Sequence, residues 1–217
     1  MSHAPAIRTR GRPLATAEQD VRASLLDAAL VRFAERGIAA TSMAQIAKQA
    51  GVTPAMVHYY FSNRDRLLDA LVEERVAPLI EQVWTATDDE VADPRLLLQG
   101  VIARMIAGVA SRPWLPPLWI GEILNESGLL RARLFARLPL PRLRALAESL
   151  GALQARGDLH PDINPQLVFV SVLGLAMLPF AAAGQQRRLP IGLTLEPDAV
   201  ARHATALLLH GLRPAPR

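Results

Sequence analysis

The chain is organised as a series of helix-length segments, and this pattern restricts its fold more than any other feature. Apolar residues recur at helical spacing, alternation of β-branched residues is nearly absent, and proline and glycine fall mainly at the joints. Such a pattern predicts an all-α fold. With 217 residues, of which 51% are hydrophobic, the chain can form one large domain or two small ones.

Helix start signals mark the first part of the chain. Thr16 and Ser42 each precede a glutamine by three residues, which is the spacing of a capping box. Thr53 stands before a proline at the first helical position, where the missing N–H costs nothing. Asn63 caps a long fourth helix, which Pro78 should kink. These signals predict four successive helices with short connections.

Two short helices joined through a glycine turn form the unit that we expect to carry the function. The segments 43–50 and 54–61 meet at Gly51, which supplies the positive φ that the turn needs. This arrangement predicts a helix-turn-helix, whose second helix enters the DNA major groove. The spacing turns Val57 and Phe61 inward. The positions left facing outward or sideways are Ala55, Met56, His58 and Tyr59, with Tyr60 at the edge of the core.

Three adjacent polar aromatic residues, His58, Tyr59 and Tyr60, follow from this orientation as candidate DNA contacts. They can hydrogen-bond to phosphate and make apolar contacts with sugar or with the thymine methyl group. The small Ala55 permits a close approach to base edges. For Tyr60 the alternative is packing against the first helix of the pair.

The first 15 residues are expected to form a flexible basic arm. Arg8, Arg10 and Arg12 lie in this stretch without any acidic residue, which suggests an anionic partner such as DNA phosphate. The net charge of +4 is a weaker signal, because Lys48 is the only lysine and the arginine excess is typical of GC-rich coding.

The stretch "TSMAQIAKQAGVTPAMVHYYFSNRDRLLDALVEE" resembles the DNA-binding signature of the TetR/AcrR family of bacterial transcriptional regulators, and the likeness covers about residues 16–75. The resemblance implies an all-helical homodimer that binds double-stranded operator DNA and a small-molecule effector, with no cofactor. Residues 16–62 would be the helix-turn-helix DNA-binding domain, and residues 63–217 the ligand-binding and dimerisation domain. The implied function is that of a cytoplasmic repressor, released from its operator by a small apolar molecule.

Site residues follow from the same resemblance. The family's phosphate contacts near its second helix fall on Thr41 and Ser42, and its usual lysine at the start of the fourth helix falls on Arg64. Its recognition-helix contacts fall on Thr53, Ala55, Met56, His58, Tyr59 and Tyr60. Ala55-Met56 stands where the family often has a Gly-Thr or Ala-Thr pair, and His58 where it often has tyrosine. The resemblance therefore implies no particular operator sequence.

Residues 163–186 carry no charge and include an apolar run long enough to span a membrane. A membrane anchor is one interpretation, but Pro179 interrupts the run and no second segment of this kind exists. The better interpretation is a helix buried in a core or in a subunit interface. We expect this helix and the last one, 198–212, to pair with their copies in a homodimer without any membrane. The predicted interface residues are Leu173, Met177, Leu207 and Leu208.

Large apolar side chains are spread over different C-terminal helices, where they form either a core or an aromatic-lined ligand cavity. They include Trp84, Met105, Trp114, Trp119, Phe135 and Phe169. Our predicted ligand contacts are Trp84, Met105, Trp119 and Glu122. In the cavity, Glu122 would favour a cationic ligand. The alternative places it at a solvated helix edge with Glu126.

Other chemistry finds little support in the sequence. The absence of cysteine excludes disulfides and Cys-ligated zinc and fits a reducing cytoplasm, and the first 20 residues contain no secretory apolar segment. His203 and His210 lie seven residues apart, and we expect packing rather than metal ligation. No nucleophile–base motif or phosphate-binding loop is present, so we expect neither an enzyme nor catalytic residues.

Overall fold

The computed structural model describes residues 14–184, 192 and 194–211, and the secondary-structure elements in these residues are all helices. The predicted all-α fold is confirmed. Arg8, Arg10 and Arg12 of the predicted arm lie outside the described residues.

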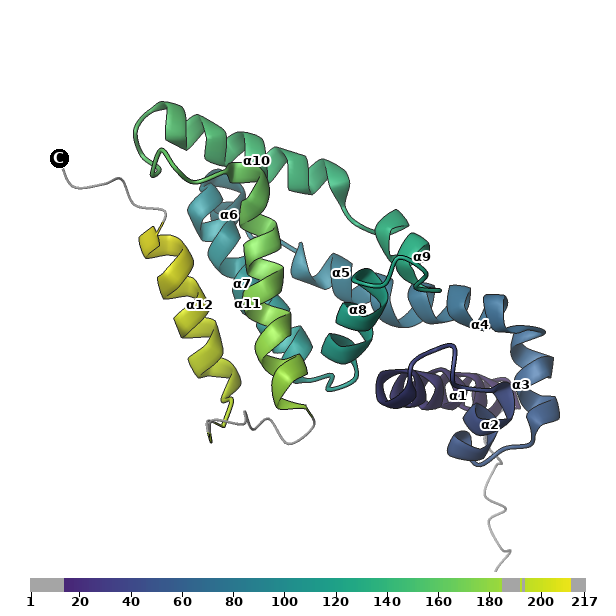
Figure 1. The fold of residues 1–217 in the computed structure, drawn as a ribbon. Coiled ribbons are helices and arrows are strands. Elements are labelled where there is room, and N and C mark those ends of the chain that lie inside the picture. The colour runs from purple at the N-terminus through teal and green to yellow at the C-terminus, as the bar shows by residue number, and fades with distance from the viewer. Residues whose placement is uncertain (1–13, 185–191, 193, 212–217) are drawn as a thin grey trace, which may run out of the picture.

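The helices form three groups along the chain. The N-terminal group is α1 (Leu14–Arg36), α2 (Met43–Ala50), α3 (Pro54–Phe61) and α4 (Arg64–Leu71). The connecting group is the π-turn η1 (Val72–Val76), α5 (Ala77–Val83) and α6 (Asp88–Ala92). The C-terminal group is α7 (Pro94–Ala110), α8 (Leu115–Ile123), α9 (Arg131–Ala136), α10 (Leu140–Ala155), η2 (Pro165–Leu167), α11 (Val168–Ala183) and α12 (Pro197–Gly211). In Figure 1 the N-terminal group lies at one end of the molecule and α12 at the other.

Most of the predicted caps are confirmed. Ser42 forms a reciprocal capping box with Gln45, in which the two side chains accept each other's backbone N–H. Gly51 ends α2 with a φ of 70°, and Asn63 accepts a backbone N–H in the first turn of α4. The predicted cap at Thr16 is wrong, because that residue lies inside α1.

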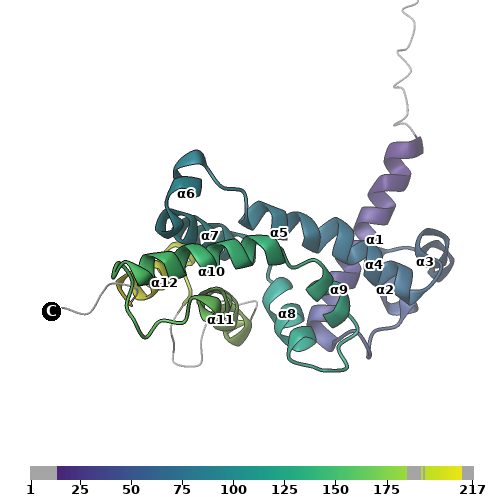
Figure 2. The same cartoon turned by 90° about the horizontal axis from the view of Figure 1, so that it is seen from above.

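The long fourth helix predicted from the sequence is divided by a π-turn. In η1 the N–H of Ala77 bonds to the carbonyl of Val72, five residues earlier. Pro78 follows at once, and its ring lacks an N–H and crowds the carbonyl four residues before it. The disruption predicted at Pro78 thus takes the form of this widened turn. Figure 2 shows α4 and α5 as a rod that runs from α3 toward α7.

The buried hydrophobic residues form two cores. The first combines the N-terminal helices and η1 with Leu118, Leu130 and Leu134 from α8 and α9. The second is built mainly from α7, α10, α11 and part of α12. Ile80 and Trp119 pack against both cores. A domain division after residue 62 stays a proposal, because the first core continues through α4 into the π-turn.

The acidic segment after α5 forms the short helix α6, which has its own capping box. Glu90 of α6 pairs with Arg104 of α7 at 2.9 Å, and this hydrogen bond holds the pKa of the Glu90 carboxyl below its usual value. Gly100 leaves the necessary room, because a Cβ there would lie 2.0 Å from the Glu90 Oε1. The pair docks α6 on α7.

The uncharged segment Pro165–Ala183 is helical, with a mean hydropathy of 2.0, and by length and composition it could cross a bilayer. Within the chain, α11 packs against α7, α8 and α12, and only 33% of its most apolar window is buried. Much of this apolar helix therefore lies at the surface of the single chain.

Candidate nucleic-acid interface and ligand cavity

Helix α3 has one buried and one exposed face. Val57 and Phe61 are 0% and 2% exposed in the first core, as their spacing predicts. On the opposite face, Ala55, His58 and Tyr59 are exposed, and the Tyr59 side chain is 70% open to solvent. Their predicted orientation is confirmed. A large aromatic residue this exposed on a short, well-anchored helix is available to a partner.

Tyr60 lies between the two faces, half-buried. Its ring meets Tyr59 edge-on at 5.1 Å and Phe61 at 6.4 Å between centroids, and the residue packs against the first core. Desolvation, and next the charge of Glu18, raise the pKa of the Tyr60 phenol above its usual value. The phenol therefore keeps its proton at neutral pH and can donate to an acceptor such as phosphate.

The imidazole of His58 is held at the end of α3. Its Nδ1 lies 3.1 Å from the carbonyl oxygen of Ser62, and because a carbonyl only accepts, Nδ1 carries the hydrogen. Ser62 itself has a φ of 57° at the C-terminal end of α3. This contact leaves Nε2 without a hydrogen bond to any described residue.

Two hydroxyl groups lie near the helix starts. Ser42 is exposed at the start of α2, where its oxygen accepts the Gln45 N–H at 3.2 Å. Thr53 is exposed at the start of α3, and its hydroxyl makes no capping hydrogen bond. Met56, also predicted as a contact, is half-buried on α3.

Two of the predicted contacts serve a different purpose. Thr41 is 1% exposed, and its hydroxyl donates to the carbonyl of Gly37 at 2.9 Å. Arg64 donates to the carbonyls of Ile38, at 2.8 Å, and of Thr41. Both side chains are engaged in fixing the loop between α1 and α2. A phosphate contact does not fit the buried Thr41, whereas for the half-buried Arg64 it stays a prediction; we assign both residues a positioning role.

Ion pairs hold the π-turn against α1. Glu74 pairs with Arg22, and Arg75 pairs with Asp27 at 2.7 Å. Arg22 also lies over the Phe61 ring, 4.9 Å from its centroid. The turn is thereby connected to the helix that supports α3.

A second series of ion pairs connects α9 and α10 to the rod formed by α4, η1 and α5. Arg133 pairs with Asp69 at 2.6 Å and with Asp65 at 3.0 Å. These bonds, Asp69 first, raise the pKa of the Arg133 guanidinium. The other pairs of the series are Arg137–Glu73 and Arg142–Glu81. No local sequence pattern indicates these pairs, because the partners lie more than 60 residues apart.

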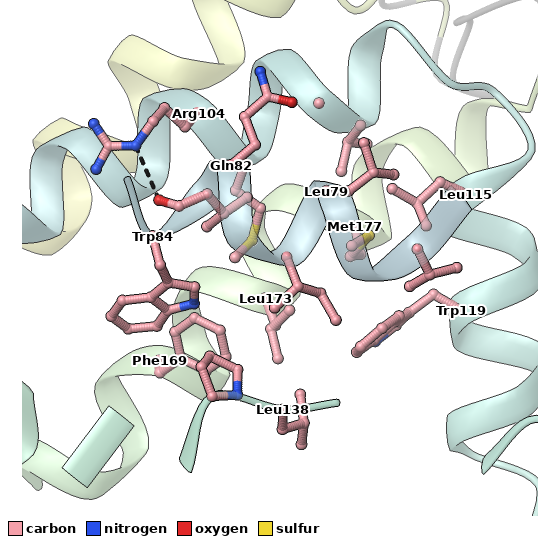
Figure 3. A pocket seen from close by; sticks show the side chains of 17 residues that line it. Leu79, Gln82, Trp84, Arg104, Leu115, Trp119, Leu138, Phe169, Leu173 and Met177 are labelled. Atoms are coloured by element: carbon pink, nitrogen blue, oxygen red, sulfur yellow. Dashed lines mark hydrogen bonds between the residues drawn. The ribbon is translucent and has the colours of Figure 1, made fainter. Parts of the chain in front are cut away.

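A cavity of about 60 Å³ lies between α5, α7, α8 and α11. As predicted, Trp84, Met105 and Trp119 line it, and Figure 3 shows their side chains around the same space as Leu173 and Met177. Nearly all of the lining is hydrocarbon or aromatic ring. The volume is well below the 300–1,000 Å³ of typical ligand pockets, so a sizeable ligand would have to spread the surrounding helices.

Glu122, the fourth predicted ligand contact, is not part of the lining. It is 8% exposed, and its Oε2 accepts the backbone N–H of Leu130 at 2.8 Å. The carboxylate thus stabilises the loop before α9. The prediction of a ligand contact at Glu122 is wrong, and with it the reason to favour a cationic ligand.

The predicted subunit contacts divide between two surfaces. Leu173 and Met177 line the cavity; Met177 is buried and Leu173 half-buried, so their contact with a second copy stays a prediction. Leu207 is 51% exposed, whereas Leu208 is half-buried against the second core. The apolar side chains that α11 and its preceding turn do expose are Leu167, Val170 and Leu178. His203 is exposed, and no group of three potential metal ligands occurs in the part of the chain that the structure describes.

Comparisons with known proteins agree with this architecture. The family model of bacterial regulatory proteins, tetR family, matches residues 25–71. The HTH-type transcriptional regulator BetI of Paraburkholderia xenovorans is 31% identical over 168 residues, which span 65% of this chain and 83% of that protein. BetI of Paraburkholderia phymatum is 29% identical over the same shares.

Solved structures show the same fold. The ketosteroid transcriptional regulator KstR2 of Mycobacterium tuberculosis matches with a TM-score of 0.67 and 20% identity over 95% of this chain and 99% of that one. HlyIIR, a hemolysin II transcriptional regulator, matches with a TM-score of 0.63 and 21% identity over 87% and 97%. The chain therefore belongs to the tetR family of bacterial regulatory proteins and is a DNA-binding transcriptional regulator.

Proposed function

We propose that this chain is a homodimeric cytoplasmic repressor that binds a palindromic operator through α3 and leaves it when a small apolar molecule enters the cavity. The observation that carries the proposal is that α3 buries one face in the first core and exposes the opposite face to solvent. The cavity beside the rod formed by α4, η1 and α5 supports the proposed release by a ligand. The proposed function involves no catalytic residue and no cofactor.

On DNA, α3 would lie in the major groove. The short side chains of Thr53 and Ala55 bring the start of the helix close to base edges, while His58 and Tyr59 reach the flanking sugar and phosphate. Ser42 and the free N–H groups at the start of α2 would approach a phosphate from the side, since a helix N-terminus favours an anion. The Tyr60 phenol would donate a hydrogen bond to a phosphate.

Dimer formation would use α11 and α12. Leu167, Val170 and Leu178 share one face with the exposed Ser171 and Gly174, because their spacing follows the turns of a helix. Figure 1 shows α11 and α12 side by side, with α1–α3 at the far end. Pairing of this face with a second copy would bury on the order of 2,000 Å² in a stable dimer. Two α3 helices would then face two operator half-sites.

Ligand entry would act through the rod. Its α4 part is fixed in the first core by Leu67 and Leu71, both 0% exposed, whereas Val83 and Trp84 at the other end line the cavity. Trp119 touches both the cavity and the first core. A ligand that prefers the spread form by about 1–3 kcal/mol would weaken operator binding roughly 5- to 150-fold.

The test begins with duplexes selected from a random pool by the purified protein. We expect a palindromic consensus, and we expect Tyr59→Ala to weaken binding to it by about 1–3 kcal/mol in a fluorescence anisotropy titration, because an exposed contact is lost without a core change. Phe135→Ala is the matched control, an exposed aromatic residue on α9. Equal binding by Tyr59→Ala and the wild type would remove α3 from the proposed interface.

A further inference from the structure

Trp84 combines deep burial with an unused hydrogen-bond donor. The residue ends α5 and is 6% exposed, and its ring packs against Phe169 with centroids 5.5 Å apart. Its backbone N–H is bonded to the preceding turn, but its indole N–H makes no hydrogen bond to any residue that the structure describes. An indole N–H can only donate, so this group is available to an acceptor beside it.

The indole nitrogen borders the cavity. Among the described residues, the fully enclosed side-chain nitrogens without a partner belong to Arg32 and Arg104, so the Trp84 nitrogen keeps contact with open space. Figure 3 shows it on the side of the ring that faces Leu173 and Phe169. A molecule in the cavity would therefore meet the N–H directly.

The other polar groups of the lining are already engaged or turned away. Arg104 donates through Nε to the Val83 carbonyl and through Nη1 to Glu90, both at 2.9 Å, and its remaining nitrogen is enclosed by protein atoms. Gln82 is exposed, and Figure 3 shows its amide turned away from the Trp84 ring. The cavity thus offers a ligand hydrocarbon, aromatic faces and one donor.

We propose that the Trp84 indole N–H is the specificity-determining donor of this cavity, and that its ligand is an uncharged, largely apolar molecule carrying one acceptor oxygen, such as a ketone or ester. This inference rests on the proposed role of the cavity as the effector site. An ionised ligand is disfavoured, because no free counter-charge lines the space and an unpaired charge is costly to bury. An amine is disfavoured for the further reason that Trp84 can only donate.

The position of Trp84 connects the hydrogen bond between its indole N–H and the ligand to the proposed regulation of DNA binding. Trp84 is the C-cap of α5. A ligand bound to its N–H is therefore held at the end of the rod formed by α4, η1 and α5. A ligand larger than the present 60 Å³ has to spread the lining elements, and two of these, α5 and α8, also contribute side chains that pack against the first core.

The experiment uses 1-indanone and indane, a ketone and a hydrocarbon of nearly the same shape, with the full-length protein. Trp84→Phe keeps a ring but removes the N–H. We expect it to weaken 1-indanone binding about 2- to 10-fold in titration calorimetry, the value of one neutral hydrogen bond, and to leave indane binding unchanged. Trp119→Phe is the matched control, a half-buried tryptophan on the same cavity, and should keep the preference for the ketone.

A second readout does not depend on the variant's folding. The indole ¹H–¹⁵N resonance that disappears in Trp84→Phe should move downfield in the wild type with 1-indanone and stay in place with indane. An unmoved resonance, an equal loss of affinity for both probes, or failure of the wild type to bind either probe would overturn the inference. If 1-indanone binds through Trp84 but operator affinity stays the same, the inference holds and ligand-controlled release fails.

Discussion

The first core and the second core differ in how completely the single chain fills and covers them. In the first, α3 has a buried face, which includes Val57, and an exposed face, which includes Tyr59, and Arg64 fixes the loop between α1 and α2. The second leaves an unfilled cavity inside and an uncovered apolar face outside. The first unit is complete as a single chain. We propose that the second is completed by a ligand and a second copy.

The ion pairs show how the two regions are joined. Acidic residues along α4, η1 and α5 face arginines from α1 on one side and from α9 and α10 on the other. Exposed pairs of this kind contribute little stability individually, but their geometry fixes how one region is oriented on the other. Through Ile80 of α5, which packs against both cores, the rod is also an element that the two cores share.

The largest expected effect comes from charging the uncovered face. Leu178→Asp places a carboxylate on the exposed stripe of α11, and we expect the dimer to dissociate because an apolar interface would have to bury an unpaired charge. Operator affinity should fall by more than about 100-fold, equivalent to about 3 kcal/mol, since each half-site would be bound alone. Sedimentation velocity at micromolar concentration and DNA titration measure both effects.

The control for this change is Val91→Asp, which charges an equally exposed apolar residue on α6. It should remain dimeric and bind DNA normally. A wild type that sediments as a monomer, or a Leu178→Asp variant that stays dimeric, would contradict the comparison, because the second region would then need no partner on this face.

The next prediction tests whether the turn between α2 and α3, in the first region, depends on the backbone conformation of its glycine. Gly51 ends α2 with a φ of 70°, a conformation that costs an L-residue about 1–2 kcal/mol. Gly51→Ala should therefore lower the free energy of unfolding by about that amount. Urea denaturation followed by circular dichroism measures it.

Gly151→Ala, in the middle of α10, is the matched control. Nothing lies within 4 Å of a Cβ built there, and alanine is the better helix former by about 0.5–1 kcal/mol, so this variant should be more stable. Equal stability of the two alanine variants would mean that the turn between α2 and α3 does not depend on its glycine.

These differences explain which predictions from the sequence succeeded. The capping box at Ser42, the turn at Gly51 and the two faces of α3 depend on neighbours within a few residues, so they could be inferred. That Leu173 and Met177 line the cavity could not be inferred, because α11 is uncharged on all sides and its pattern does not show which face meets the cavity. Glu122 failed because its partner, a backbone N–H in a loop, has no sequence signature.

The smallest expected effect concerns the connection between the regions. Arg133→Gln removes the guanidinium that bridges Asp65 and Asp69, and we expect the free energy of unfolding to fall by about 0.2–1 kcal/mol at low salt. The deficit should shrink at about 1 M salt, where charges are screened within about 3 Å. Arg144→Gln, an exposed change on α10, should have no effect at either salt concentration. A deficit that persists in high salt would mean that Arg133 acts through packing or through its hydrogen bond to the Leu129 carbonyl. In that case the rod would be held to α9 by its shape, and the acidic residues along it would not set the orientation of the two regions.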